Sequence, residues 1–144
     1  MSIKWIFDLD DTLYSMTSLY QYIVSENSRF LNYTKLEKDE FLIILLSILK
    51  GEKIIYTNGT RGHMDLVIEK LEIKNFFHRF NYREKTGLKP DVNSFKKFKT
   101  VNYIKDTDTC FFFEDNLLNL IEAKKNNWIP VLIQPNTSLH NNKN

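Results

Sequence analysis

The sequence lacks the features on which several classes of protein depend. One cysteine in 144 residues excludes an internal disulfide framework and a zinc site built from several cysteines. The longest apolar run, residues 41–46, is far shorter than the roughly 20 residues that a membrane-spanning helix needs. Asp8 interrupts the N-terminal segment before a secretory signal could form. We therefore expect a cytoplasmic protein with no membrane partner.

A strong excess of charge of either sign is also missing. The 20 basic and 18 acidic residues leave a net charge of +2, so a nucleic-acid partner is not supported by charge. The 42% hydrophobic and 26% charged residues are typical of a globular protein, and the length fits a single domain. We expect one domain over residues 1–135 and a polar tail over residues 136–144. Nothing in the composition indicates the oligomeric state.

Short apolar segments alternate along the chain with segments of helical periodicity. The apolar runs predict strands over residues 3–7, 53–56, 80–83, 109–113 and 129–133. The helical spacing predicts helices over residues 16–32, 35–50, 64–71, 89–99 and 117–125. This order predicts an α/β fold with a mainly parallel sheet and crossover helices.

Particular residues predict where these elements begin and end. Thr34 and Glu37 have the spacing of a capping box for the second helix, and Gly51 predicts its end. Pro90 is compatible with the first turn of the fourth helix. Pro130 predicts that the last strand lies at an edge of the sheet.

Three predicted strands end in groups that can carry out chemistry. These groups are Asp8 and Asp10 after the first strand, Thr57 and Asn58 after the second, and Glu114 and Asp115 after the Phe-rich strand. Open parallel sheets bind ligands outside the carboxyl ends of their strands, so the three segments are expected to meet. Clustered carboxylates repel one another unless they take up protons or a cation, and oxygen ligands alone suit Mg²⁺. A single acid in a turn is equally explained as a helix cap, but two acidic strand ends favour a metal site.

The remaining groups are suited to an anion. The hydroxyl of Thr57 and the turn at Asn58-Gly59 offer donors to an anionic oxygen. Lys89 lies between Gly87 and Pro90, just before a predicted helix. A turn or a surface lysine has an ordinary structural explanation by itself, but both together with the acids favour a phosphate site.

Four segments in this order resemble the motifs of the haloacid dehalogenase (HAD) superfamily. They are Phe7-Asp8-Leu9-Asp10-Asp11-Thr12-Leu13-Tyr14, Ile54-Ile55-Tyr56-Thr57-Asn58-Gly59, Lys89 in Gly-Leu-Lys-Pro-Asp, and Phe113-Glu114-Asp115-Asn116 through Asn119. The wording of the first motif is nearest to the pyrimidine 5′-nucleotidase-type branch. The resemblance implies a Rossmann-like three-layer sandwich with a minimal cap.

The resemblance also implies a phosphatase with assigned residue roles. Asp8 would be the nucleophile that forms an aspartyl-phosphate, and Asp10 the general acid and base. Thr57, Asn58 and Lys89 would hold the phosphoryl group. Magnesium would be bound by Asp8, the main-chain carbonyl of Asp10 and Asp115, with Glu114 as a direct or water-mediated helper. An acid at Asp10 points to phosphate rather than carbon–halogen chemistry, because the dehalogenase branch lacks it.

The chain departs from the nucleotidase-type branch in the size of its cap. That branch has a helical cap between its first two motifs, whereas only about 45 residues separate Asp10 from Thr57 here. Residues 14–34 are left as a reduced or vestigial lid. We expect a phosphorylated substrate, a small molecule such as a nucleotide rather than a macromolecule. The alternatives are a catalytically silent binding or regulatory protein and, less well matched, a phosphate-receiver domain.

A few further residues have weaker interpretations. Tyr14, Tyr20 and Tyr22 are interpreted as packing residues that could also line the entrance, and Arg61 is a secondary candidate for substrate contact. His63 and His78 have no partner pattern and are interpreted as surface or packing residues.

Overall fold

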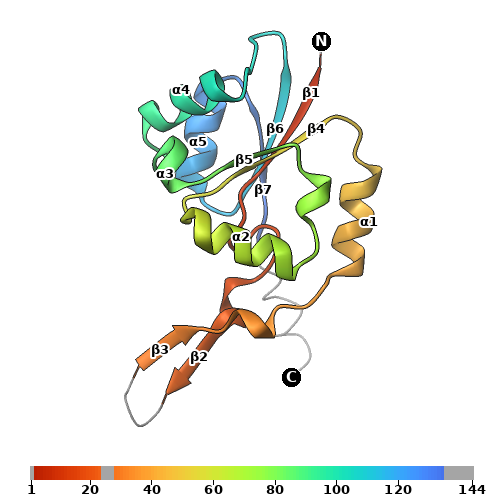
Figure 1. The fold of residues 1–144 in the computed structure, drawn as a ribbon. Helices are drawn as coiled ribbons and strands as arrows, with labels where there is room; N and C mark the ends of the chain where they lie inside the picture. The colour runs from red at the N-terminus through yellow and green to blue at the C-terminus, as the bar shows by residue number, and fades with distance from the viewer. Residues whose placement is uncertain (1, 24–27, 135–144) are drawn as a thin grey trace.

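The fold is built on one five-stranded parallel sheet, as the sequence predicts. The structure is a computed structural model that describes residues 2–23 and 28–134. Strands follow the order β5-β4-β1-β6-β7, and every neighbouring pair is parallel. Their bounds are Ile3–Phe7 (β1), Glu52–Tyr56 (β4), Arg79–Asn81 (β5), Thr109–Glu114 (β6) and Ile129–Leu132 (β7). Figure 1 shows this sheet running through the middle of the molecule.

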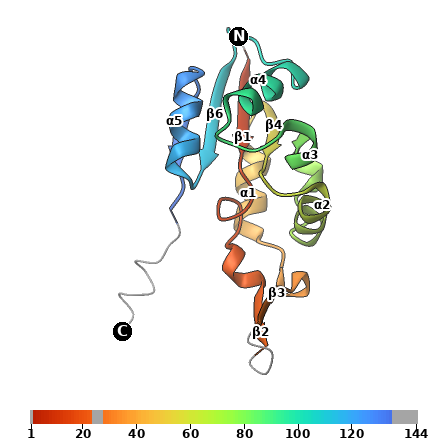
Figure 2. The same cartoon turned by 90° about the vertical axis from the view of Figure 1, so that its left-hand side faces the viewer.

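Helices cover both faces of the sheet and complete a three-layer α/β sandwich (Figures 1 and 2). Helices α1 (Glu40–Ile48) and α2 (Arg61–Lys70) pack on one face. Helices α4 (Val92–Val101) and α5 (Leu117–Lys125) pack on the other, and the short α3 (Arg83–Thr86) precedes α4. Successive side chains of a strand point to opposite faces, and two separate hydrophobic cores result.

The two cores differ in composition. The core beneath α1 and α2 contains Phe7, Ile55 and Val67. The core beneath α4 and α5 is largely aromatic, with Tyr56 stacked on Phe98 at a centroid distance of 4.3 Å. This second core fixes β4 and β6 firmly, and both strands end at the candidate site.

The segment between β1 and α1 differs from its prediction. A helix is predicted over residues 16–32, but the chain forms a 3₁₀ turn η1 (Met16–Leu19) and an antiparallel hairpin of β2 (Tyr20–Ile23) and β3 (Ser28–Leu31). A further 3₁₀ turn, η3 (Tyr33–Lys35), leads to α1. Tyr20, Tyr22 and Ile23 are residue types that favour a strand, and in the folded chain β2 pairs with β3 despite the approximate helical spacing. The hairpin extends away from the sheet (Figure 1).

The predicted beginning of α1 is also wrong, whereas its end, at Ile48, lies two residues before the predicted one. The helix begins at Glu40, where the side chain of Asp39 accepts hydrogen bonds from the main-chain N–H groups of Phe41 and Leu42. Thr34 instead binds the side chain of Asn32, so Thr34 and Glu37 form no capping box. Gly51 lies beyond the helix in the turn to β4 at φ 128°, and a Cβ there would lie 2.8 Å from the Ile3 carbonyl oxygen.

In the middle of the chain, the observed bounds of the elements differ from the predicted bounds by a few residues. Strand β5 ends at Asn81, so Arg83 belongs to α3 rather than to the predicted strand. Helix α4 begins after its N-cap Asp91, which leaves Pro90 outside the helix. Pro130 lies on the edge strand β7, as predicted. The predicted tail, residues 136–144, lies outside the described residues.

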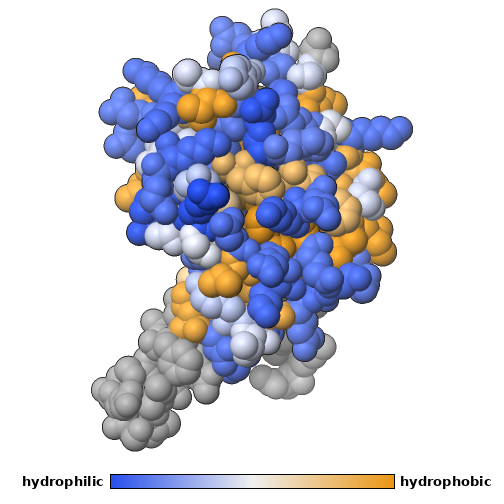
Figure 3. Space-filling view, viewed as in Figure 1, coloured by the Kyte–Doolittle hydropathy of each residue, from blue (hydrophilic) through white to orange (hydrophobic). Residues whose placement is uncertain are grey.

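Helix α1 exposes an apolar face. Phe41, Ile44 and Ile48 are more than half exposed, and Figure 3 shows apolar side chains gathered over this part of the surface.

Among residues 2–23 and 28–134, no helix has the length and hydrophobicity that crossing a bilayer requires.

Candidate active site

The carboxyl ends of β1 and β6 bring three acids together. The strands are neighbours, and the main-chain N–H of Asp8 donates to the carbonyl of Phe113 at 2.9 Å. Carboxylate oxygens of Asp8, Glu114 and Asp115 lie within 4.8 Å of one another. Asp8 and Glu114 are buried. Residues 106 positions apart in the chain therefore form one acidic cluster.

Lys89 supplies the positive charge of this cluster. Its ammonium group is fully buried and donates to Asp8 Oδ1 at 3.1 Å, Glu114 Oε2 at 2.8 Å and the carbonyl of Tyr56 at 2.6 Å. These three bonds use all three of its N–H donors. An incoming phosphate would have to replace one of these partners.

The charges of the cluster are not balanced. Three carboxylates face one ammonium, and burial raises the pKa of Asp8 to about 6 although Lys89 opposes the shift. Burial, with the nearby Asp8, also raises the pKa of Asp115. Burial alone would lower the pKa of Lys89, but Asp8 and Glu114 outweigh it and keep that pKa above its usual value. The cluster therefore has an excess of negative charge and favours a bound cation.

The acids differ in how many of their oxygens are already engaged. Glu114 Oε2 accepts from Lys89 and from the Asn119 amide at 3.2 Å, and Oε1 accepts from the main-chain N–H groups of Asp115 and Asn116. Glu114 thus orients its neighbours with both oxygens. A donor set of hard carboxylate oxygens suits Mg²⁺, so the residues present fit that ion, with Asp8 and Asp115 the better direct ligands.

The turn after β4 is packed tightly against the cluster. Thr57 is buried, and its Oγ1 accepts from the main-chain N–H of Gly59 at 3.0 Å. The side chain of Asn58 accepts from Lys89 N at 2.7 Å and donates to Lys89 O at 3.1 Å. The side chain of Asn58 therefore holds the main chain of Lys89. The carbonyl of Asn58 accepts from Arg83 Nε at 2.9 Å, so the main-chain N–H of Asn58 is the group of this residue that can face a phosphate.

Asp10 lies beside this cluster in a network that sequence reasoning missed. Its Oδ1 is 2.7 Å from His63 Nε2 and accepts a hydrogen bond of 2.5 Å from the hydroxyl of Tyr14. The hydroxyl of Tyr33 is 2.6 Å from His63 Nδ1. The interpretation of His63 as a residue without a partner is wrong. His78 is exposed, as predicted, but it too has a partner, because its Nδ1 accepts from the main-chain N–H of Lys53 at 3.0 Å.

A sequence signal for His63 existed. Thr60 follows the turn at Thr57 and caps α2, where its hydroxyl accepts from the main-chain N–H of His63. A residue in the first turn of a helix that starts at the carboxyl edge of the sheet is held close to any ligand bound there. Thr12 could also have been found from the sequence, because it belongs to the first motif, four residues after Asp8. Its hydroxyl donates to Asp8 Oδ2 at 3.0 Å.

A cavity of about 390 Å³ opens beside Asp10. Its walls include Asp10, His63 and Arg83 from the core, and Met16, Leu31 and Tyr33 from the segment between β1 and α1. Tyr14 belongs to the network around Asp10, while the side chains of Tyr20 and Tyr22 lie outside the described residues. A leaving group released next to Asp10 would occupy this space.

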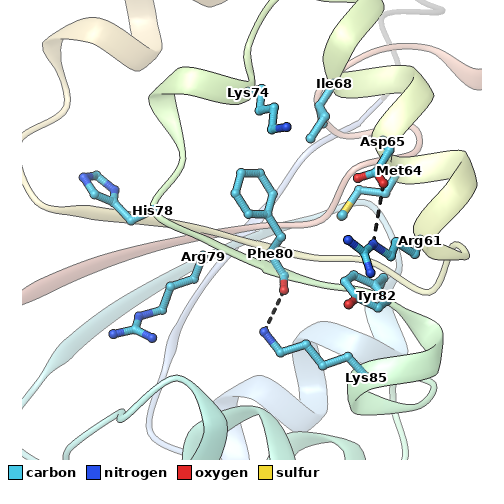
Figure 4. A pocket seen from close by; sticks show the side chains of 10 residues that line it. All are labelled: Arg61, Met64, Asp65, Ile68, Lys74, His78, Arg79, Phe80, Tyr82 and Lys85. Carbon is cyan, nitrogen blue, oxygen red and sulfur yellow. Dashed lines mark hydrogen bonds and ion pairs between the residues drawn. The ribbon is translucent and has the colours of Figure 1, made fainter.

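A second cavity, of about 420 Å³, lies beside the edge strand β5 (Figure 4), and its lining includes neither Asp10 nor any of the three acids of the cluster. Arg61 lines this cavity, with its guanidinium 3.6 Å from Asp65 and 5.7 Å from the centre of the Tyr82 ring. Lys85 donates to the carbonyl of Phe80. The structure thus directs Arg61, predicted as a secondary substrate contact, to a different cavity from the one beside Asp10.

Comparisons with known proteins agree with this architecture. No protein-family model and no curated protein matches the chain. Similar solved structures include an L-2-haloacid dehalogenase from Xanthobacter autotrophicus, with TM-score 0.67, 14% identity, and coverage of 97% of this chain and 81% of that one. A hydrolase from Streptococcus pneumoniae has TM-score 0.64 and 12% identity and covers 97% of both chains.

The UTR4 protein of Saccharomyces cerevisiae is also similar, with TM-score 0.56 and 17% identity. The match covers 65% of this chain but only 46% of the yeast protein, so the chain spans about half the length of that relative. These likenesses, all below 25% identity, concern the fold. The strand order and the structural matches together show that this chain has an α/β fold similar to that of the L-2-haloacid dehalogenase and of the Streptococcus pneumoniae hydrolase.

Proposed function

We propose that the protein is a hydrolase of the haloacid dehalogenase type, specifically a Mg²⁺-dependent phosphatase that forms an aspartyl-phosphate on Asp8. The main support is the buried position of Asp8, which contacts Lys89 and belongs to the same acidic cluster as Asp115. Phosphoryl transfer depends mostly on positioning and on neutralising charge, and this cluster supplies both.

In the first half-reaction, an oxygen of Asp8 attacks phosphorus. The bond from phosphorus to the leaving oxygen breaks while Asp10 gives that oxygen its proton. Lys89, the Thr57 hydroxyl and the main chain at Asn58 hold the phosphoryl oxygens. Thr12 and Lys89 each donate to one oxygen of Asp8, so the carboxylate is already oriented before substrate arrives.

In the second half-reaction, water attacks the phosphorus of the aspartyl-phosphate. Asp10 takes the proton of that water, and the bond between phosphorus and the Asp8 oxygen breaks, which releases phosphate and restores both side chains. Because Asp10 donates a proton first and accepts one later, a single carboxyl group serves both steps.

The implied magnesium ion would be held by Asp8, Asp115 and the main-chain carbonyl of Asp10, with Glu114 assisting through water because its oxygens are engaged. When bound, the ion neutralises charge that would otherwise keep a phosphate dianion away from Asp8. The excess of carboxylates over ammonium groups supports this assignment.

Asp10 favours phosphate chemistry over carbon–halogen chemistry. In a haloacid the leaving group is a halide ion, which needs no proton, whereas an alkoxide or phenoxide leaving group does. His63 and Tyr14 both bond to Asp10 Oδ1 and hold this carboxyl group in place, which supports Asp10 as a positioned group for proton transfer. The cavity of about 390 Å³ suits the leaving group of a small phosphomonoester, nucleotides included.

The test compares the wild type with Asp8→Asn on a panel of phosphomonoesters and nucleotides with Mg²⁺. We expect the wild type to release phosphate, chelation of Mg²⁺ to stop it, and Asp8→Asn to lower turnover at least about 10³-fold, because the nucleophile is lost. Full activity in Asp8→Asn would remove the assignment of Asp8. Chloride release from 2-chloropropionate without phosphate release would indicate a dehalogenase, and inactivity on every substrate would favour the binding protein.

A further inference from the structure

A chain of hydrogen bonds runs from Asp10 through His63 of α2 to Tyr33 of η3. His63 Nε2 is 2.7 Å from Asp10 Oδ1, and His63 Nδ1 is 2.6 Å from the hydroxyl of Tyr33. Tyr14 donates to the same Asp10 oxygen. The side chain of His63 is only 11% exposed, so water competes little for these bonds. Three separate parts of the chain therefore hold one carboxyl group.

The partners determine the direction of each bond. Asp10 Oδ1 accepts, so the proton of a neutral His63 ring lies on Nε2 and Nδ1 is an acceptor. The Tyr33 hydroxyl then donates to Nδ1 and selects this tautomer. Both ring nitrogens are engaged, which leaves His63 without a nitrogen for direct attack, metal binding or proton delivery to substrate.

The two oxygens of Asp10 consequently differ. Oδ1 accepts from His63 and from Tyr14. Oδ2 lies on the side of Gly59, where an added Cβ would be 3.6 Å away, and both Asp10 and Gly59 line the cavity of about 390 Å³. The arrangement leaves Oδ2 as the oxygen that can reach a leaving group in that cavity.

We propose that His63 is a positioning residue for Asp10, and that Tyr33 acts through it by fixing the imidazole tautomer. This inference rests on the proposed phosphatase function. Oδ2–H gives its proton to the leaving oxygen as the bond from that oxygen to phosphorus breaks, and Oδ2 later takes a proton from the attacking water. The His63 proton stays on Nε2 throughout and holds Oδ1 in place.

The test uses two substrates that differ in their need for an acid. Phenyl phosphate has a strongly basic leaving group, whereas 2,4-dinitrophenyl phosphate has a weakly basic one that leaves without a proton. The kcat/KM for each ester reports the steps up to release of the leaving group. Wild type, His63→Ala, His63→Gln and Tyr33→Phe are compared. His78→Ala is the matched control, because His78 also accepts a hydrogen bond, from the main-chain N–H of Lys53, but lines the cavity beside β5 and not the one beside Asp10.

We expect His63→Ala to lower kcat/KM for phenyl phosphate about 100-fold and for 2,4-dinitrophenyl phosphate less than about 5-fold, since only the first ester needs a well-placed acid. Tyr33→Phe keeps the imidazole. It should lower the ratio of kcat/KM for phenyl phosphate to kcat/KM for 2,4-dinitrophenyl phosphate by about 10-fold. His63→Gln retains an N–H near the position of Nε2 and should recover part of the loss. His78→Ala should match the wild type on both esters.

The outcomes separate this inference from the function on which it rests. Suppose that the wild type is active and Asp8→Asn is inactive, but that His63→Ala and Tyr33→Phe lower kcat/KM for the two esters by equal factors. His63 then has only a structural role, and the inference is overturned. A wild type that hydrolyses neither ester would overturn the proposed function and this inference together. Circular dichroism of each variant verifies that the fold is retained.

Discussion

Asn58 acts on the site through another residue. Its side chain binds both the N–H and the carbonyl of Lys89, and Lys89 in turn contacts Asp8 and Glu114. The loop that carries Lys89 is thus tied to the end of β4 by two hydrogen bonds between residues 31 positions apart. The position of the buried ammonium depends on this contact.

Replacing Asn58 by alanine tests this dependence. We expect Asn58→Ala to lower the free energy of unfolding by about 2 kcal/mol, because two hydrogen bonds of about 1 kcal/mol each are lost. Turnover should fall as well, since Lys89 is no longer held. Chemical denaturation gives the stability, with Asn93→Ala, at an exposed position, as the control. Equal stability of the two variants would show that the contact does not hold the loop.

The residue scale is also where sequence reasoning was least complete. The types and positions of Asp8, Thr57, Lys89 and Asp115 indicated a phosphate and metal site before any coordinates. The pairing of His63 with Asp10 was not visible, because it joins residues 53 positions apart through side-chain geometry that no periodicity encodes.

At the scale of elements, the strands were predicted best. A buried parallel strand has apolar residues on both faces, so its sequence is a short apolar run with abrupt ends. The segment at residues 16–32 was predicted worst, because its apolar spacing fits a helix and a hairpin almost equally. The antiparallel pairing of β2 with β3, which the apolar spacing does not encode, distinguishes the hairpin from a helix.

Helix α4 illustrates what packing contributes to an element. Phe98 is fully buried, stacks on Tyr56 and lies 5.4 Å from the ring centre of Trp128. Phe98→Ala should lower the free energy of unfolding by 3–5 kcal/mol, roughly, because the cavity left behind cannot fully close. Phe41→Ala, on the exposed face of α1, should change it by less than about 0.5 kcal/mol. Urea denaturation of both variants measures the contrast, and similar losses would contradict the assignment of the aromatic core.

For the molecule as a whole, the acidic cluster links folding to pH and to cations. The pKa of Asp8 is about 6 in the folded protein against an ordinary value of 3.8, so the folded state binds this proton more tightly than the unfolded chain. The corresponding stability is present below pH 3.8 and is lost as pH rises through about 6. The difference amounts to roughly 3 kcal/mol.

Magnesium should reverse this loss. We expect Mg²⁺ to raise the Tm little at pH 5 and clearly at pH 7.5, because protons compete with the cation for Asp8. Thermal unfolding with Mg²⁺ or with a chelator, at both pH values, measures the effect. In Asp8→Asn the metal-free protein should be more stable at pH 7.5 than the wild type, and the Mg²⁺ effect should shrink. A Mg²⁺ effect of the same size at both pH values would contradict a site that includes Asp8.

The amino-acid sequence alone determined the alternation of strands and helices, the parallel sheet and the acids at the ends of β1 and β6, because all of these are local patterns of hydrophobicity and residue type. Only the tertiary structure decided that residues 20–31 contain a hairpin, that Glu114 and Asn58 orient Lys89, and that Tyr33 and His63 hold Asp10. The physical reason is that these features depend on side chains from distant segments meeting within hydrogen-bond distance, and that geometry exists only once the chain has folded.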